Sequence, residues 1–151
     1  MTTVTVVTQV DAPVERVFEV FTDLDQSAER VSNIQKIEVL TAGGFKLGTR
    51  WMETREVMGQ LDSAEMKVTA FERNRTYTIT HHKAATRVDT VFTFEPYEDS
   101  TKVRIELAIE SHGLPPGLIA PFTWASTGKV RDVIGRDLAD LKESMEKQPN
   151  W

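Results

Sequence analysis

The chain contains no cysteine among its 151 residues. Disulfide bonds, thiolate nucleophiles and cysteine-ligated zinc are therefore excluded within this chain. Only three histidines are present, and neither a His-Glu-x-x-His pattern nor a Gly-x-Ser-x-Gly pattern occurs. These are the patterns of helical zinc sites and of serine hydrolases. We therefore expect no metal centre and no hydrolysis through a nucleophilic side chain.

Positive charge is scarce and scattered. The chain has 18 Lys and Arg against 23 Asp and Glu, which gives a formal net charge of -5, and the basic residues form no run. Such a distribution lacks the basic footprint of a nucleic-acid-binding surface. The glycines Gly43, Gly44 and Gly48 do not fit Gly-x-Gly-x-x-Gly and lie between strand-like segments, which favours a turn. We expect neither a nucleic-acid partner nor a nucleotide or other cofactor.

Long apolar runs are also missing. No segment reaches the 18 apolar residues typical of a membrane span, and the first residues lack a basic and then apolar signal segment. We expect a cytoplasmic protein with no membrane span. With 40% hydrophobic residues, residues 1–151 suit one globular domain, which buries roughly 68–70% of its unfolded surface. For the oligomeric state, the sequence is compatible with both a monomer and a homodimer.

The spacing of apolar residues changes along the chain from a strand-like to a helical pattern and back. Thr2–Val10 is rich in Val and Thr and predicts a strand. Pro13 then favours the first turn of a helix. Apolar residues follow at helical spacing and would share one stripe facing the core: Val14, Val17, Phe18 and Phe21. A short, mostly polar second helix is expected over Gln26–Asn33.

From Ile34 onward apolar residues recur at every second position, which is typical of antiparallel strands with one solvated face. Turn-like residues separate the expected strands. The strands are expected around Ile37 and Val39, over Leu47–Met58, Ala64–Ala70, Thr76–Lys83, Val88–Phe94 and Val103–Ile109. The turns between them are expected at Ala42–Gly44, Gln60–Ser63, Arg73–Arg75 and Glu95–Thr101.

Helical spacing returns at the end of the chain. A loop at Leu114–Gly117 precedes a predicted helix over Pro121–Glu146, which would be about 39 Å long and could cross the whole sheet. The predicted class is α+β, in which one strand, two helices, six strands and a long C-terminal helix follow one another. A curved antiparallel sheet wrapped around that helix is suited to enclosing a small apolar molecule.

Several segments in this order resemble the START-like (SRPBCC) helix-grip superfamily, and its polyketide cyclase and dehydrase-like branch in particular. They are Val10–Phe18 followed by Asp23, Gly48–Trp51 with Arg55–Gly59, Ser100–Val103 and Asp137–Lys142. The resemblance implies a sheet gripping the C-terminal helix, with a cavity between them. It does not imply one reaction. Members bind lipids, hormones or aromatic polyketides, some catalyse cyclisation or dehydration, and others bind partner proteins.

Two strand registers place different side chains inside. If Trp51 faces inward, Glu53, Arg55 and Val57 share its face, and a hairpin around Gln60 sets this face opposite Met66, Val68 and Ala70. A slip of one residue would instead bury Met52, Thr54, Glu56 and Met58. We favour the first register. Glu53 and Arg55 would then need each other or a ligand, because unpaired buried charge is costly. A structural ion pair near the rim, or exposure to solvent, would also explain them.

Three further polar residues share the inward parity of their strands. His81, aligned with Tyr77 and Ile79, could donate a hydrogen bond or shuttle a proton, or it could be a bonded structural histidine. Tyr77 could present a phenol to a carbonyl or enolate, or simply pack. Thr90 could orient a ligand hydroxyl.

Apolar residues on the inner faces would form the walls of a site, and each would equally suit an ordinary core. The walls are Phe92, Phe94, Ile105, Leu107, Phe122, Val133 and Ile134, together with Trp51, Met66, Val68 and Ile79. His112, Leu114 and Trp124 fall near a loop that could cover an entrance.

These residues support three functions. The first is binding of a small hydrophobic or aromatic molecule, lipid or polyketide-like, between the sheet and the C-terminal helix. The second, motivated by the resemblance, is a polyketide cyclase or aromatase that uses Arg55, Tyr77 and His81 as acid-base residues. The third is a protein-interaction or stress-related module.

Overall fold

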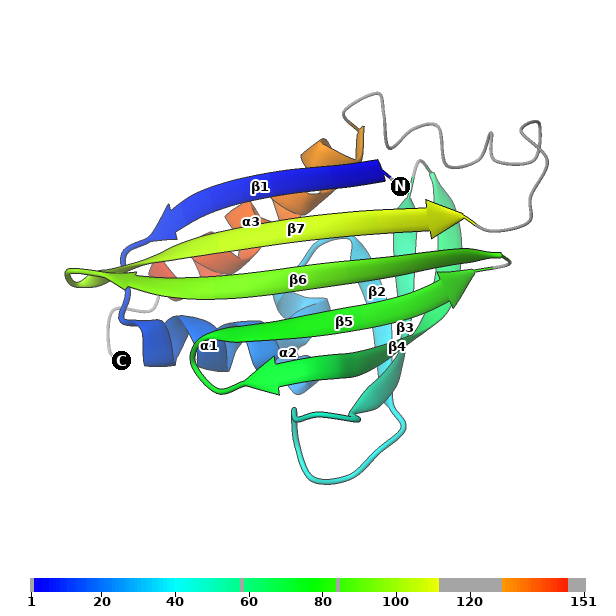
Figure 1. Cartoon of the computed structure of the whole chain (residues 1–151), viewed down its shortest axis with the longest axis horizontal. Helices are drawn as coiled ribbons and strands as arrows, with labels where there is room; N and C mark the ends of the chain where they lie inside the picture. Colours follow the sequence, from blue (N-terminus) through cyan, green and yellow to red (C-terminus); the bar gives the residue numbers. More distant parts are fainter. Residues whose placement is uncertain (1, 58, 84, 112–128, 147–151) are drawn as a thin grey trace.

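The computed structural model describes residues 2–57, 59–83, 85–111 and 129–146. These residues form one antiparallel sheet and three helices (Figure 1). In chain order the elements are β1 (Thr2–Val10), α1 (Val14–Thr22), α2 (Leu24–Arg30), β2 (Ile34–Val39), β3 (Arg50–Val57), β4 (Gln60–Glu72), β5 (Thr76–Lys83), β6 (Thr86–Tyr97), β7 (Ser100–Ser111) and α3 (Lys129–Glu146). The predicted order of one strand, two helices, six strands and a helix is confirmed.

The sheet has the strand order β1-β7-β6-β5-β4-β3-β2, so β1 lies beside the last strand of the chain. Figure 1 shows that the sheet is strongly curved and that α1, α2 and α3 lie on one of its faces. The core forms between that face and the helices. Position on this inner face therefore decides which side chains meet.

Helix α1 follows Pro13 as predicted. Val17, Phe18 and Phe21 are buried, and Val14 packs against the same core. Helix α2 covers Leu24–Arg30, so the prediction of Gln26–Asn33 was two residues late at its start and three late at its end. The chain becomes extended at Val31, where Val31 and Ile34 are buried. Burying these two apolar side chains stabilises the fold more than one further turn of a mostly polar helix would.

Strands β1 and β5 have the predicted bounds. The predicted turn over Gln60–Ser63 was wrong, because these residues begin β4 and pair with β3. The chain reverses just before them, where Gly59 has a φ of 79° that glycine adopts readily. All four residues are exposed, so their polar character reflects solvent around this end of the hairpin.

Two other boundaries differ from prediction. Strand β3 begins at Arg50, because Gly48 has a φ of 89° and Leu47, 63% exposed, stays in the preceding loop. Strand β6 continues to Tyr97 and strand β7 begins at Ser100. The turn expected over Glu95–Thr101 is therefore shortened to two residues.

The described part of helix α3 covers Lys129–Glu146, within the predicted helix, and the expected N-terminal portion, residues 121–128, lies outside the described residues. Ile134, Leu138 and Met145 are buried in the core. Phe122 and the expected cover residues His112, Leu114 and Trp124 also lie outside the described part. Among the helices that are described, none has the length and apolar character needed to span a membrane.

Candidate functional site

The favoured register of β3 is confirmed on its inner face. Trp51 is 1% and Glu53 7% exposed, and Trp51 faces Met66 across the ladder. The slipped register was wrong for Met52, Thr54 and Glu56, because they alternate with these residues and point to the outer face. Met58 lies outside the described residues.

The partners assigned to this face need correction. Glu53 pairs with Ala64 and Arg55 with Asp62, because β4 begins earlier than predicted, so Val68 and Ala70 lie beyond them on the ladder. The register between β4 and β5 also shifts between Val68 and Ala70. Such a bulge reverses the alternation of side chains.

The bulge exchanges one inner-face residue for another. Ala70 is exposed, whereas Phe71 is partly buried and packs against the core. Val68, before the bulge, is fully buried as expected. The inner face of β4 therefore ends in a phenylalanine that periodicity did not predict.

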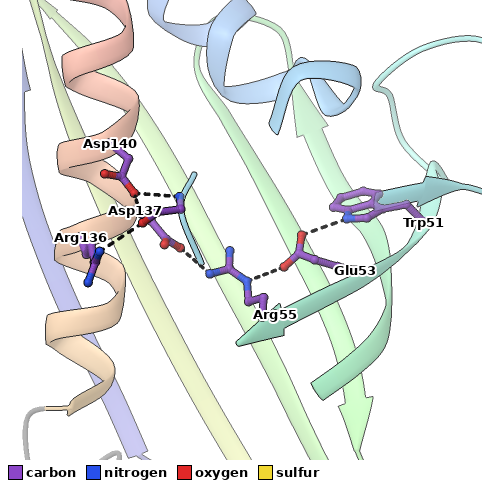
Figure 2. A network of polar contacts seen from close by, with 7 residues as sticks. Trp51, Glu53, Arg55, Arg136, Asp137 and Asp140 are labelled. Carbon is purple, nitrogen blue, oxygen red and sulfur yellow. Dashed lines mark hydrogen bonds and ion pairs between the residues drawn. The ribbon is translucent and has the colours of Figure 1, made fainter. Parts of the chain in front are cut away.

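A chain of polar contacts runs from β3 to α3 (Figure 2). Trp51 Nε1 donates to Glu53 Oε1 at 3.2 Å. Arg55 Nε donates to Glu53 Oε2 at 2.7 Å, and Arg55 Nη1 donates to Asp137 Oδ2 at 2.7 Å. Arg55 thus joins the sheet to the closing helix. We call Glu53, Arg55 and Asp137 the charged triad.

Burial and pairing shift the pKa values of the triad. Burial disfavours the charge of Arg55, but Glu53 and Asp137 outweigh it and raise the pKa of Arg55. Burial raises the pKa of Asp137, and Arg55 opposes this shift only in part. One cation is shared by two carboxylates, so Asp137 is incompletely neutralised. Its Oδ1 atom is buried and accepts no hydrogen bond within the described structure.

A second polar group fastens α3 next to the triad. Asp140 Oδ2 accepts hydrogen bonds from Ser32 N at 3.0 Å and Ser32 Oγ at 2.8 Å. Arg136 Nε donates to Ser32 Oγ at 3.2 Å. Figure 2 shows Arg136 and Asp140 beside Asp137 on the same helix. These contacts fix the helix that carries Asp137 against the segment between α2 and β2.

His81 lies on the inner face of β5, partly buried and opposite Val88 on β6. Burial lowers its pKa below 6.5, although the charges of Glu53 and Asp62 act in the other direction. The imidazole is therefore neutral at pH 7 and able to accept a proton. Adjacent His82 is exposed on the opposite face.

Tyr77 lies in an aromatic cluster. Its ring stacks on Phe92 at a centroid distance of 4.6 Å and meets Phe45 edge-on at 4.9 Å. Phe18 and Phe94 each lie 5.7 Å away. Burial raises the pKa of Tyr77 well above 10.0, so its phenol stays protonated. Within the described residues, no hydrogen bond links Tyr77 to Arg55 or His81.

The predicted wall residues lie on or near the core. Val68, Phe94, Ile105 and Ile134 are buried. The partly buried members are Met66, Ile79, Thr90, Phe92, Leu107 and Val133. The structure thus gathers those of the predicted residues that it describes on one side of the sheet, but Arg55 belongs to the charged triad and Tyr77 to the aromatic cluster.

Sequence reasoning missed Asp137 and Phe45 as members of the site. A usable signal existed for Asp137, which is spaced three residues after Ile134 and four before Leu141 and so shares their stripe. An acid in an apolar stripe needs a buried partner. Phe45 had no periodic signal because it lies in the loop between β2 and β3, yet it contacts Trp51, Phe71 and Tyr77.

Among the described residues, no group of three or more potential ligands is placed to hold a metal ion. The candidate site instead combines aromatic and aliphatic side chains, the charged triad between β3 and α3, and His81, whose pKa burial lowers. The fold is the helix-grip fold, in which a curved antiparallel sheet packs around a C-terminal helix.

The chain belongs to the polyketide cyclase / dehydrase and lipid transport family, whose model matches residues 1–146. The expected membership of the START-like superfamily and its cyclase-like branch is thereby confirmed. A search of curated proteins finds no match.

Solved structures share the fold at low sequence identity. The protein TTHA0849 from Thermus thermophilus is 18% identical, with a TM-score of 0.79, and the match covers 98% of this chain and 99% of that one. The Zhui aromatase/cyclase from Streptomyces sp. R1128 is 14% identical, with a TM-score of 0.81 and coverages of 97% and 94%. A START superfamily protein from Mycobacterium smegmatis is 16% identical, with a TM-score of 0.67 and coverages of 92% and 99%.

Proposed function

We propose that residues 1–151 form a single domain that binds a small hydrophobic or aromatic molecule, lipid or polyketide-like, in a cavity between the sheet and α3. The observation that carries the proposal is the charged triad, whose Glu53 is buried beside Trp51 and lies opposite Ile37 and Ala64 on the neighbouring strands. Buried ion pairs contribute little net stability compared with apolar residues of the same volume. A few placed polar groups within apolar walls are instead typical of ligand sites.

Family membership supports the same interpretation. The family description covers both lipid transport and polyketide cyclisation, and both activities require an apolar ligand to enter the protein. The aromatic residues Tyr77, Phe92 and Phe94, together with Ile105 and Leu107, would contact such a ligand. The triad would orient its polar end.

Titration with a neutral fluorescent probe such as N-phenyl-1-naphthylamine tests this function. We expect saturable binding at one site per chain, with energy transfer from Trp51. A double variant, Val7→Ser with Leu61→Ser, serves as control, because both residues are exposed and would account for adsorption to the surface. The proposal fails if binding does not saturate, or if the control variant abolishes it.

A polyketide cyclase or aromatase activity is the second candidate, and it is favoured by the neutral His81 on the same inner face as Arg55. In this hypothesis His81 accepts a proton from the carbon next to a ketone, and Arg55 stabilises the resulting enolate oxygen. The enolate carbon bonds to the carbon of a second ketone in the same molecule, whose C=O π bond breaks, and Tyr77 protonates the alkoxide so formed. The proton held by His81 then restores the Tyr77 phenol, so no co-reactant is consumed. Nothing beyond the side chains is needed for these steps.

The cyclase hypothesis is tested with a soluble poly-β-ketone analogue, by chromatographic separation of the cyclised product. Loss of turnover in His81→Gln and Tyr77→Phe, with probe binding retained, would support it. Tyr77→Phe removes only a hydroxyl that has no hydrogen bond within the described residues, so we expect the variant to fold normally. Undiminished turnover in both variants, or none in the parent protein, would contradict this hypothesis.

A further inference from the structure

The charged triad has two features that bear on which ligands it admits. The first is the buried Asp137 Oδ1 atom, which no described donor reaches. An ionised carboxylate oxygen that is shielded from both water and protein donors carries a desolvation cost. A ligand that brings a donor to this atom would recover part of that cost. A ligand without a donor would leave it in place.

The second feature is the charge count. Glu53 and Asp137 each contact Arg55 at 2.7 Å, so two carboxylates surround one guanidinium and the triad carries a net charge of -1. Figure 2 shows the two acids approaching Arg55 from opposite sides. An incoming carboxylate would add a third negative charge in a poorly solvated place. Like charges at short range are strongly unfavourable there.

Arg55 still has donors to offer. A guanidinium carries five N–H groups, and the contacts among the described residues use the Nε and one Nη1 donor. The triad can therefore both donate to a ligand oxygen and accept from it. A hydroxyl is the simplest uncharged group that matches both functions.

From this geometry we infer that the triad selects neutral ligands bearing a hydroxyl group, such as a phenol, an enol or an alcohol, and discriminates against carboxylates. The hydroxyl donates to Asp137 Oδ1 and accepts from Arg55. This inference rests on the proposed ligand-binding function and names the ligand class of the same site. The raised pKa of Asp137, caused by burial, agrees with a carboxyl group that lacks a donor.

Four naphthalenes test the inference by calorimetry at pH 7.5, where 2-naphthol is neutral and 2-naphthoate is ionised. 2-Naphthol supplies donor and acceptor, 2-methoxynaphthalene only an acceptor, and naphthalene neither. We expect 2-naphthol to bind about tenfold more tightly than 2-methoxynaphthalene, since a hydrogen bond to a charged group has this magnitude. 2-Naphthoate should bind more weakly than naphthalene.

The variant Asp137→Asn assigns the preference to the triad. Its amide keeps the size of the carboxyl group but removes the negative charge, so the preference for 2-naphthol should fall to about twofold or less and 2-naphthoate should gain affinity. Asp132→Asn makes the same change on an exposed residue of α3 and should leave all four affinities unchanged. Circular dichroism checks that both variants fold.

The outcomes separate the inference from the function on which it rests. Saturable binding of all four compounds without a preference for 2-naphthol, or a preference that Asp137→Asn leaves intact, overturns the inference while the binding function stands. Absence of saturable binding by every compound removes both. The ligand series on the parent protein is decisive even if Asp137→Asn fails to fold.

Discussion

At the scale of single residues, Arg55 has the most consequential environment. Its guanidinium lies between the carboxylates of Glu53 and Asp137, whose side chains are 9% and 17% exposed. Removing one partner of a buried charge group is costly because the remaining charges stay desolvated. The same residue type on the same strand, Arg50, pairs with Glu65 in solvent, with side chains 42% and 49% exposed. The two arginines form a matched pair for experiment.

We predict that Arg55→Met lowers the free energy of unfolding by about 3 kcal/mol, because Glu53 and Asp137 lose their counter-ion. Arg50→Met should cost less than about 1 kcal/mol, as is typical of exposed ion pairs. Urea denaturation of both variants gives the comparison. If both variants lose the same free energy of unfolding, Arg55 in the triad contributes no more to stability than an exposed ion pair does.

His81 gives a prediction for pH. Burial lowers its pKa in the folded state below 6.5, so between the two values the unfolded chain binds more protons and stability falls as the pH decreases. The free energy of unfolding should therefore decrease less between pH 7 and pH 5 in His81→Gln than in the parent protein. His82→Gln, on the exposed face, is the control. An unchanged pH dependence in His81→Gln would refute the assignment.

At the scale of elements, the attachment of α3 determines where Asp137 lies. Helix α3 carries an apolar stripe, but two polar groups set its position. Arg55 reaches it from β3, and Asp140 and Arg136 hold Ser32 from the segment before β2. Because hydrogen bonds are directional, these contacts define the rotation of the helix about its axis and its position along that axis more narrowly than apolar packing does.

We expect Ser32→Ala to lower the free energy of unfolding by about 1 kcal/mol, through loss of its hydroxyl contacts with Asp140 and Arg136. Amide hydrogen exchange in α3 should quicken, while exchange in β6 and β7 stays near the parent rate. Ser63→Ala, which removes an exposed contact with Thr54, should leave α3 unaffected. Unaltered exchange in α3 of Ser32→Ala would mean that apolar packing alone holds the helix.

Elements also show what sequence could and could not predict. Strand β1 was predictable because a Val- and Thr-rich run ends at a clear break before Pro13. The start of β4 was not, because exposed polar residues at the end of a hairpin look like a turn. The bulge after Val68 depends on pairing with β5, which local alternation does not contain. Asp137 was missed because its partner Arg55 lies 82 residues away.

At the scale of the whole molecule, the curved sheet and its helices bring inner-face residues from every part of the described chain to one side. Aromatic rings from α1, β4, β5, β6 and the loop after β2 meet around Tyr77. The charged triad lies between β3 and α3. This arrangement follows from the order of the elements, whereas the chemistry depends on a few side chains placed within it.

Two-dimensional NMR of the isotope-labelled protein during titration with 2-naphthol tests the central claim most directly. The account predicts saturable shifts of the Trp51 indole N–H and the Arg55 Nε–H, with ligand contacts to Leu107 and Ile105. Val7 and Leu61 on exposed surfaces should not respond. Shifts confined to exposed residues, with Trp51 and Arg55 unchanged at saturation, would contradict binding between the sheet and α3.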